Sequence, residues 1–200
     1  MRNIEVIDNF FNNFDNIKDE FKKIPMYDCE TYKKKQVNVS NDIEYLKDSF
    51  FPGLRSESFH IRNPFAFNLV METIFNKLNS SYGNIFLDVS THLRLAEDDA
   101  KDYVHTDPTI STMIVYLSET NMKSGTGFYK TREDTTPYMT VPAIQNTAVF
   151  FPGSIPHKSL LNYGTNIDDG RLTLNGFIYD LKWYTNKRHT IYYHYFQHLY

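Results

Sequence analysis

The stretch "DYVHTDPTISTMIVYLSE", residues 102–119, places a histidine and an aspartate two positions apart, directly before a run of alternating apolar residues. Such alternation is typical of a β-strand that buries one face. If the segment around His105 and Asp107 is extended, both side chains point to the same face. The stretch therefore predicts a strand of a β core with a polar pair at its entrance.

Further β-prone runs lie on both sides of this stretch. Gly, Pro, Asn and Asp separate them, and the whole set covers residues 84–95, 110–117, 126–131, 138–142, 146–151 and 171–181. Many short strands with turn residues between them are typical of a β-sandwich or barrel. The second half of the chain is therefore expected to form an antiparallel β core.

The first part of the chain has a different period. Residues 4–24 ("IEVIDNFFNNFDNIKDEFKKI") and 66–79 ("AFNLVMETIFNKLN") place apolar side chains three and four positions apart. This spacing predicts two amphipathic helices that pack on something larger. The segment between them, "FPGLRSESFHIRNPF" (51–65), holds two prolines and a glycine and predicts a loop-rich connection. We interpret its first part, "FPGLRSES", as a connector, with part of a substrate-channel lid as the alternative.

The composition excludes several classes of protein. The 200 residues fit one domain, and 16% of them are aromatic, so the core is expected to be rich in Phe and Tyr. A net charge of −3 lacks the strong positive charge typical of nucleic-acid-binding domains. Cys29 is the only cysteine, which excludes an intrachain disulfide and suits a reducing compartment.

The start of the chain indicates no targeting segment. Residues 1–20 carry acids throughout and lack the apolar core of a signal peptide. No stretch approaches the ~20 apolar residues of a membrane span. We therefore expect a soluble, cytoplasmic protein without a membrane partner.

A second histidine and an arginine follow the opening pair. His157 comes shortly after the run 146–151, and Arg171 opens the last run. Two imidazoles and one carboxylate make the facial triad of non-haem iron(II) oxygenases, which leaves half of the coordination sphere free. An arginine inside a β core is costly unless it meets an anion, and its planar fork suits a carboxylate. Thr173 shares a face with Arg171 and offers a further hydrogen bond.

In this order the residues resemble the iron(II)/2-oxoglutarate-dependent dioxygenases, and within them the branch that includes the prolyl 4-hydroxylases. That family carries an HxD motif, then a distal His, then an Arg or Lys shortly afterwards. Here the matching positions are His105 and Asp107, then His157, then Arg171. The similarity extends through "VYLSETNMKSGTGFYK", "AVFFPGSIPHKSL" and "GRLTLNGFI", and covers roughly residues 84 to 181.

The resemblance implies a mainly β fold with flanking N-terminal helices and a double-stranded β-helix core (a cupin-like jelly roll). It implies that His105, Asp107 and His157 bind Fe(II), while Arg171, assisted by Thr173, binds the far carboxylate of 2-oxoglutarate. The family's reaction uses O2, converts 2-oxoglutarate to succinate and CO2, and hydroxylates a substrate C–H bond. Some relatives also need ascorbate to rescue oxidised iron. By this resemblance the chain is an enzyme that acts on a small molecule or peptide, with an amino-acid side chain as the implied target.

One position departs from the prolyl-hydroxylase pattern. Relatives in that branch often carry a Tyr that touches 2-oxoglutarate, just after the Arg of the strand that precedes HxD. Here Arg94 is followed by Leu95. Tyr103 and Tyr116 are the candidates to replace that contact, and Tyr116 joins Arg171 and Thr173 in the expected cofactor-binding set. Arg94 is interpreted as a solvated strand end, with a contact to substrate or cosubstrate as the alternative.

We expect a single domain over residues 1–200. Residues 1–83 would be a helical support, 84–181 the β-helix core, and 182–200 a C-terminal cover. The last segment is aromatic and contains His194 and His198 at a spacing that suits zinc on a helix, but covering the end of the β core is the favoured interpretation. The sequence gives no prediction of oligomeric state.

Two other functions stay open. The first is a jelly-roll module that binds a ligand or plays a structural role without catalysis. The second is an oxygenase that acts on nucleobases, whose family members commonly carry a second Arg six residues after the anchoring Arg. Phe177 occupies that position here, which argues against nucleic acid as the substrate.

Overall fold

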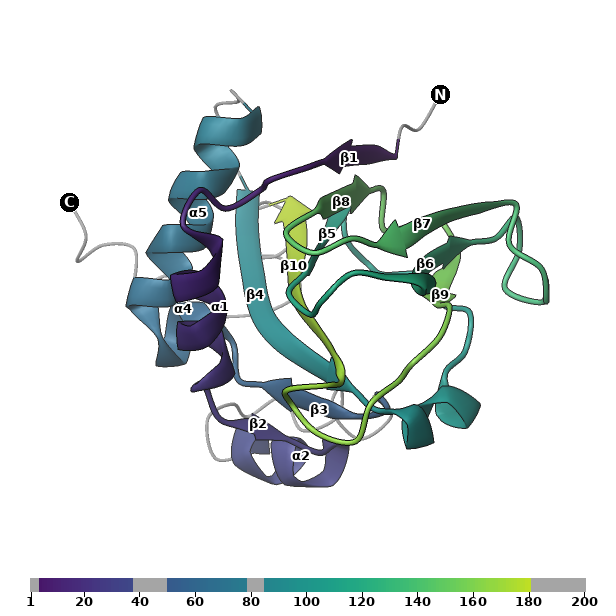
Figure 1. Cartoon of the computed structure of the whole chain (residues 1–200), viewed down its shortest axis with the longest axis horizontal. Coiled ribbons are helices and arrows are strands. Elements are labelled where there is room, and N and C mark those ends of the chain that lie inside the picture. Colours follow the sequence, from purple (N-terminus) through teal and green to yellow (C-terminus); the bar gives the residue numbers. More distant parts are fainter. Residues whose placement is uncertain (1–3, 38–49, 79–84, 181–200) are drawn as a thin grey trace.

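The computed structural model describes residues 4–37, 50–78 and 85–180, and its order of elements follows the predicted change from helices to strands (Figure 1). The helices are α1 (Phe14–Lys22), α2 (Cys29–Val37), α4 (Phe59–Arg62), α5 (Pro64–Leu78) and the short 3-10 helix η1 (Ala96–Lys101). The strands are β1 (Glu5–Ile7), β2 (Met26–Tyr27), β3 (Leu54–Ser56), β4 (Ile85–Arg94), β5 (Ser111–Tyr116), β6 (Asn121–Phe128), β7 (Met139–Ala143), β8 (Ala148–Phe151), β9 (His157–Ser159) and β10 (Arg171–Asp180).

The strands form two antiparallel sheets that pack on one another. The large sheet has the order β1-β8-β5-β10-β4-β3-β2, and the small sheet has the order β7-β6-β9. Apolar side chains from both sheets meet in a shared cluster that includes Tyr116, Phe128, Val141 and Phe151. The two sheets therefore enclose an interior, with β4, β5 and β10 on one wall and β6, β7 and β9 on the other (Figure 1).

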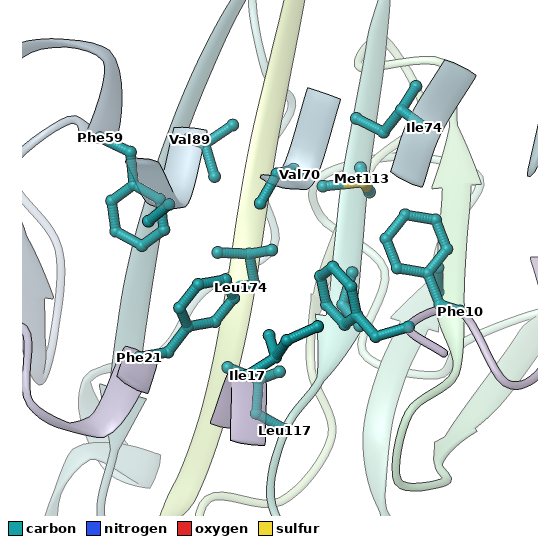
Figure 2. Close-up of a cluster of buried hydrophobic side chains, with 14 of the residues drawn as sticks. Phe10, Ile17, Phe21, Phe59, Val70, Ile74, Val89, Met113, Leu117 and Leu174 are labelled. Atoms are coloured by element: carbon teal, nitrogen blue, oxygen red, sulfur yellow. The ribbon is translucent and has the colours of Figure 1, made fainter. Parts of the chain in front are cut away.

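Helices α1, α4 and α5 cover the outer face of the large sheet (Figure 1). Helix α5 buries one residue per turn at Ala66, Val70 and Ile74, as expected for a helix with one apolar stripe. Figure 2 shows Val70 and Ile74 packed with residues such as Val89 and Leu174 of the sheet. The predicted helix over 66–79 is confirmed.

The two faces of β4 have opposite character because successive side chains of a strand alternate. Leu87, Val89 and Leu93 join the core under the helices. The opposite face carries the polar or charged residues Ser90, His92 and Arg94, and both Ser90 and His92 are buried. The interior is therefore built to hold polar groups at this wall.

The predicted helix over residues 4–24 is wrong in its first half. Residues Glu5–Ile7 form β1, which pairs with β8, and Asn9 has a positive φ of 49° that stops any helix there. The side chain of Asn146 accepts a hydrogen bond from the Phe11 backbone N–H at 2.9 Å and donates one to the Phe11 carbonyl at 2.9 Å. Because this distant residue satisfies the backbone, the helix begins only at Phe14.

The expected helical support over residues 1–83 also contains strands. The segment 51–65, predicted as a loop-rich connection, contains β3 and α4, and β3 pairs with both β2 and β4. Among the predicted strands, 126–131 is displaced, because β6 spans Asn121–Phe128, and β9 was missed. The C-terminal segment 182–200, with His194 and His198, lies outside the described residues. Within the described ranges, none of the helices has the length and apolar character needed to cross a membrane.

Candidate metal centre

Two segments that are far apart in the sequence meet at the mouth of the interior. His105 and His157 form an isolated antiparallel bridge, in which each backbone N–H donates to the other residue's carbonyl, at 3.0 and 2.8 Å. The Asp107 N–H donates to the carbonyl of Gly153 at 2.8 Å, just before His157 in the chain. These backbone bonds fix the HxD segment beside the start of β9.

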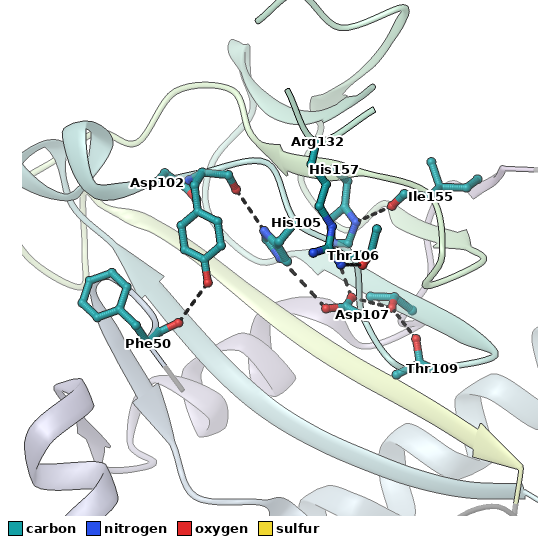
Figure 3. Close-up of polar contacts among 11 residues, drawn as sticks. Phe50, Asp102, His105, Thr106, Asp107, Thr109, Arg132, Ile155 and His157 are labelled. Carbon is teal, nitrogen blue, oxygen red and sulfur yellow. Dashed lines mark hydrogen bonds and ion pairs between the residues drawn. The ribbon is translucent and has the colours of Figure 1, made fainter. Parts of the chain in front are cut away.

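The side chains of His105, Asp107 and His157 converge (Figure 3). Each offers one ligand atom, and these atoms all lie within 4.8 Å of one another. Nε2 of His157 lies 3.4 Å from Oδ2 of Asp107, and Nε2 of His105 lies 4.0 Å from Oδ1. The centroids of the two imidazole rings lie 4.5 Å apart, and the ring planes are tilted by 53°.

Both histidines are oriented so that Nε2 is the free nitrogen. Nδ1 of His105 lies 3.0 Å from the Tyr103 carbonyl, and Nδ1 of His157 lies 2.9 Å from the Ile155 carbonyl. A carbonyl can only accept, so in the neutral rings the proton is on Nδ1 and the lone pair on Nε2. A backbone carbonyl in this role is a common way to fix the tautomer of a metal-binding histidine.

The protonation states suit a cation. Burial acts to raise the pKa of Asp107, but the neighbouring His157, His105 and Thr112 outweigh it, and the pKa lies below its ordinary value. Burial and the charge of His157 lower the pKa of His105. The carboxylate is therefore ionised and His105 is neutral at pH 7, which are the forms that bind metals.

The hydroxyl of Thr112 holds Asp107 in place. Its Oγ1 donates to Oδ2 of Asp107 at 2.7 Å and contacts Oγ1 of Thr109 at 2.9 Å. These hydrogen bonds use Oδ2 of Asp107. Oδ1, which lies on the side of His105, has no hydrogen bond from the described residues. Two imidazoles and one oriented carboxylate fit a divalent metal with open positions, since nothing in the arrangement closes the remaining coordination sites.

Arg171 points into the interior, as the sequence predicts. Its side chain is only 5% exposed, and one amino group donates to the Gly125 carbonyl at 3.2 Å. Gly125 lies at a bulge of β6 with a φ of 139°, which turns its carbonyl toward Arg171. Nε of Arg171 is buried without a hydrogen-bond partner among the described residues. A buried guanidinium with unused donors fits an anion.

Thr173 and Tyr116 lie beside Arg171. Thr173 and Tyr116 are direct cross-strand partners, and the guanidinium of Arg171 lies 5.8 Å from the centre of the Tyr116 ring. The Thr173 hydroxyl is 2.8 Å from Oδ1 of Asn175, and the Tyr116 hydroxyl is 2.8 Å from Oγ1 of Thr126. Both hydroxyls therefore have protein partners already, and a ligand has to share them.

The other candidates differ in position. The Tyr103 side chain is 48% exposed and donates to the Phe50 carbonyl at 3.2 Å, beside the ring of His105. Tyr116, not Tyr103, is thus the tyrosine next to Arg171. Arg94, interpreted from sequence as a solvated strand end, faces the interior instead: its NH1 nitrogen is buried and has no partner within the described ranges.

Several polar residues of this interior were missed by sequence reasoning. Thr112 orients Asp107, His92 is 4% exposed and bonds to the Ser90 hydroxyl at 2.9 Å, and Arg55 of β3 lies opposite His92. For β4 the sequence does indicate a polar face, because every second residue from Asp88 to Arg94 is polar. For Arg55 the sequence offered no strand pattern.

Comparisons with solved structures identify the fold. The structure of HygX from Streptomyces hygroscopicus with nickel, 2-oxoglutarate and hygromycin B bound matches with a TM-score of 0.59 and 10% identity, over 90% of this chain and 83% of that one. A 2OG-Fe(II) oxygenase family oxidoreductase from Burkholderia pseudomallei matches with a TM-score of 0.52 and 9% identity, over 88% and 84% of the two chains. The epimerase SnoN from nogalamycin biosynthesis matches with a TM-score of 0.51 and 11% identity, over 90% and 78%.

No family model matches the sequence, and no curated protein does. The structural likeness at these identities establishes the fold alone. It is the mainly β, double-stranded β-helix fold of the 2-oxoglutarate oxygenases, with flanking helices, as predicted from the sequence.

Proposed function

We propose that the chain is an iron(II)/2-oxoglutarate-dependent dioxygenase. The observation that carries the proposal is the convergence of His105, Asp107 and His157 at the mouth of the β-helix, with both Nε2 lone pairs and a free carboxylate oxygen on the same side. A metal-free binding module has no need for this donor set. In the proposal these three residues hold Fe(II).

Arg171 is proposed to bind the far carboxylate of 2-oxoglutarate. Its buried position and its unpaired Nε support this role, because an unpaired buried charge costs several kcal/mol unless an anion meets it. Thr173 and Tyr116 are proposed to assist, each through a hydroxyl that already bonds to a neighbour. When bound, iron and 2-oxoglutarate supply the oxidising chemistry, with O2 consumed and succinate and CO2 released.

The residues of the chain position these groups and limit access of water. The backbone bridge between His105 and His157 sets the spacing of the two imidazoles, and Thr112 sets the orientation of Asp107. Phe151 packs edge-on against the His157 ring with centroids 4.6 Å apart, so one side of the site is apolar. Apolar packing of this kind keeps solvent from the ligands and raises the strength of the charged contacts.

The proposed reaction is hydroxylation of a C–H bond in an amino-acid side chain, either of a free amino acid or within a peptide. We propose that the chain forms one domain and works in the cytoplasm. The solved structures of this fold include an epimerase and a complex with hygromycin B, so the fold serves more than one outcome and substrate. Phe177 occupies the position where nucleobase-directed relatives carry an Arg, which supports a substrate other than nucleic acid.

The test measures succinate formed from 2-oxoglutarate with added Fe(II), for the wild type and for His105→Ala. We expect iron-dependent succinate in the wild type and none above background in the variant. Because the assay contains no substrate, it is paired with an anaerobic measurement of the metal absorption band that depends on 2-oxoglutarate. If both signals are absent from the wild type, the non-catalytic jelly-roll module is the better description.

A further inference from the structure

Three arginines carry their side chains on the same face of the large sheet. Arg171 of β10 is the direct cross-strand partner of Arg94 of β4, and Arg55 of β3 is the direct partner of His92 of β4. Directly opposed residues have Cβ atoms about 5 Å apart, and like charges in such pairs are destabilising. Buried nitrogens of all three arginines have no hydrogen-bond partner among the described residues: Nε of Arg55, NH1 of Arg94 and Nε of Arg171.

The electrostatics agree with this geometry. Burial is the main reason that the pKa of His92 lies well below its ordinary value, and the charges of Arg55, Arg94 and Arg171 lower it further. Burial likewise lowers the pKa of Arg94 to about 10. The charges of Arg171 and Arg55 lower it further, while those of Asp102 and Asp98 oppose the shift. A neutral His92 thus lies between three cations. His105 of the metal centre also acts on His92, so the cluster belongs to the same interior.

Arg55 and Arg94 make close contacts with residues that are not counter-ions. The Arg55 guanidinium lies 4.3 Å from the centre of the Phe51 ring. The Arg94 stem passes so close to Gly53 that a Cβ there would lie 3.0 Å from its Cδ. Among the ion pairs of the described residues, none includes Arg55, Arg94 or Arg171.

The nearby carboxylates are already engaged elsewhere. Asp98 accepts hydrogen bonds from the N–H groups of Gly53 and Leu95. Two further carboxylates have other partners: Asp102 accepts from Asn162 at 3.3 Å, and Glu57 pairs with Arg62 at 3.1 Å. One 2-oxoglutarate carboxylate on Arg171 leaves Arg55 and Arg94 without an ion pair among the described residues, since Asp102 and Asp98 act on Arg94 only from beyond ion-pair distance.

We propose that Arg55 and Arg94 form a second anion site, which binds a carboxylate or phosphate group of the substrate. This inference rests on the proposed function and specifies its substrate class: a molecule that carries its own negative group to the wall opposite the metal. The site is distinct from that of 2-oxoglutarate, because β3 and β4 supply it and β10 supplies Arg171. Charge-assisted bonds from two arginines select for an anion over a neutral substrate of the same shape.

The test uses the metal-free protein and two probes, inorganic phosphate and malonate, titrated by calorimetry. Arg55→Met and Arg94→Met keep an unbranched side chain beside Phe51 and Gly53 and remove the charged group, which in Arg55 is the guanidinium over the Phe51 ring. We expect each variant to weaken binding of the preferred probe by at least about tenfold, as for the loss of a charge-assisted hydrogen bond. Comparison of the two probes shows whether the site prefers phosphate or carboxylate.

Arg62→Met is the matched control, because Arg62 is half exposed and pairs with Glu57 on the surface. It is expected to leave binding of both probes unchanged. Thermal unfolding without any anion shows that the variants are folded: Arg94→Met is expected to keep or raise the melting temperature, since it removes a charge opposed to Arg171. The proposal is overturned if neither probe binds the wild type, or if binding depends on Arg171 and not on Arg55 and Arg94.

A separate titration of 2-oxoglutarate into the manganese-loaded protein distinguishes this proposal from the proposed function. Arg55→Met and Arg94→Met are expected to retain 2-oxoglutarate affinity within about threefold, while Arg171→Met loses it. Absence of 2-oxoglutarate binding in the wild type, with phosphate or malonate still dependent on Arg55 and Arg94, refutes the dioxygenase and retains the anion site. If the wild type binds 2-oxoglutarate but its binding of phosphate and malonate does not depend on Arg55 and Arg94, the anion site alone is refuted.

Discussion

Replacing Arg171 by Met separates cosubstrate binding from metal binding. The guanidinium is buried, and among the described residues it makes one hydrogen bond, to the Gly125 carbonyl. In the variant a bound carboxylate loses its charged partner, and breaking such a buried pair costs about 3–5 kcal/mol. At about 1.4 kcal/mol per factor of ten, the dissociation constant of 2-oxoglutarate is expected to rise by roughly two to four powers of ten.

The fold itself is expected to tolerate this change. The Gly125 carbonyl keeps a second donor, the N–H of Leu160 at 3.2 Å, so no buried acceptor is left unpaired. Calorimetric titration of 2-oxoglutarate into manganese-loaded protein gives the affinity, and a manganese titration of the same variant is expected to match the wild type. A change in 2-oxoglutarate affinity below tenfold would refute the assignment of Arg171.

Two further predictions concern the metal ligand and the fold. Asp107→Ala is expected to weaken manganese binding by more than about 100-fold, because even residues that only hydrogen-bond to a metal ligand contribute about 10–100-fold to metal affinity. The control is Asp134→Ala, which removes an exposed carboxylate that caps the Thr131 turn. Equal manganese affinities of the two variants in a metal titration would contradict the role of Asp107 as a ligand. Asn146→Ala is expected to lower the free energy of unfolding by about 2–4 kcal/mol, because it leaves the N–H and carbonyl of Phe11 buried without their partners. Urea unfolding checks this, and a loss below about 1 kcal/mol would show that water or another group replaces the amide.

The parts of the fold that could be predicted are those whose pattern is local. Alternating apolar residues gave most strands of the β core, and the four-residue spacing in 66–79 gave α5. The structure brings together His105, Asp107 and His157, which the motif order had grouped, and it turns Arg171 inward. Their roles as ligands of iron and 2-oxoglutarate stay proposals that the experiments above test.

The parts that failed depend on distant residues. Residues 4–14 have the spacing of a helix, but the strand β8 and the amide of Asn146 supply their backbone partners from the far end of the chain. The sequence predicts a connector around Arg55, because β3 is only three residues long and is formed by pairing with β2 and β4. Neither pairing is encoded in the local pattern, so no window along the sequence could show it.

The reciprocal backbone bonds between His105 and His157 determine how the centre responds to its ion. They join the two imidazole-bearing segments directly, so the ligand geometry is set by the same hydrogen bonds that close the barrel. An arriving cation therefore meets a preorganised site and has little conformational entropy to overcome. Exchange of one divalent ion for another is expected to leave the architecture unchanged. Which metal is bound then depends on the chemistry of the ligand atoms and on the availability of each ion, and not on folding.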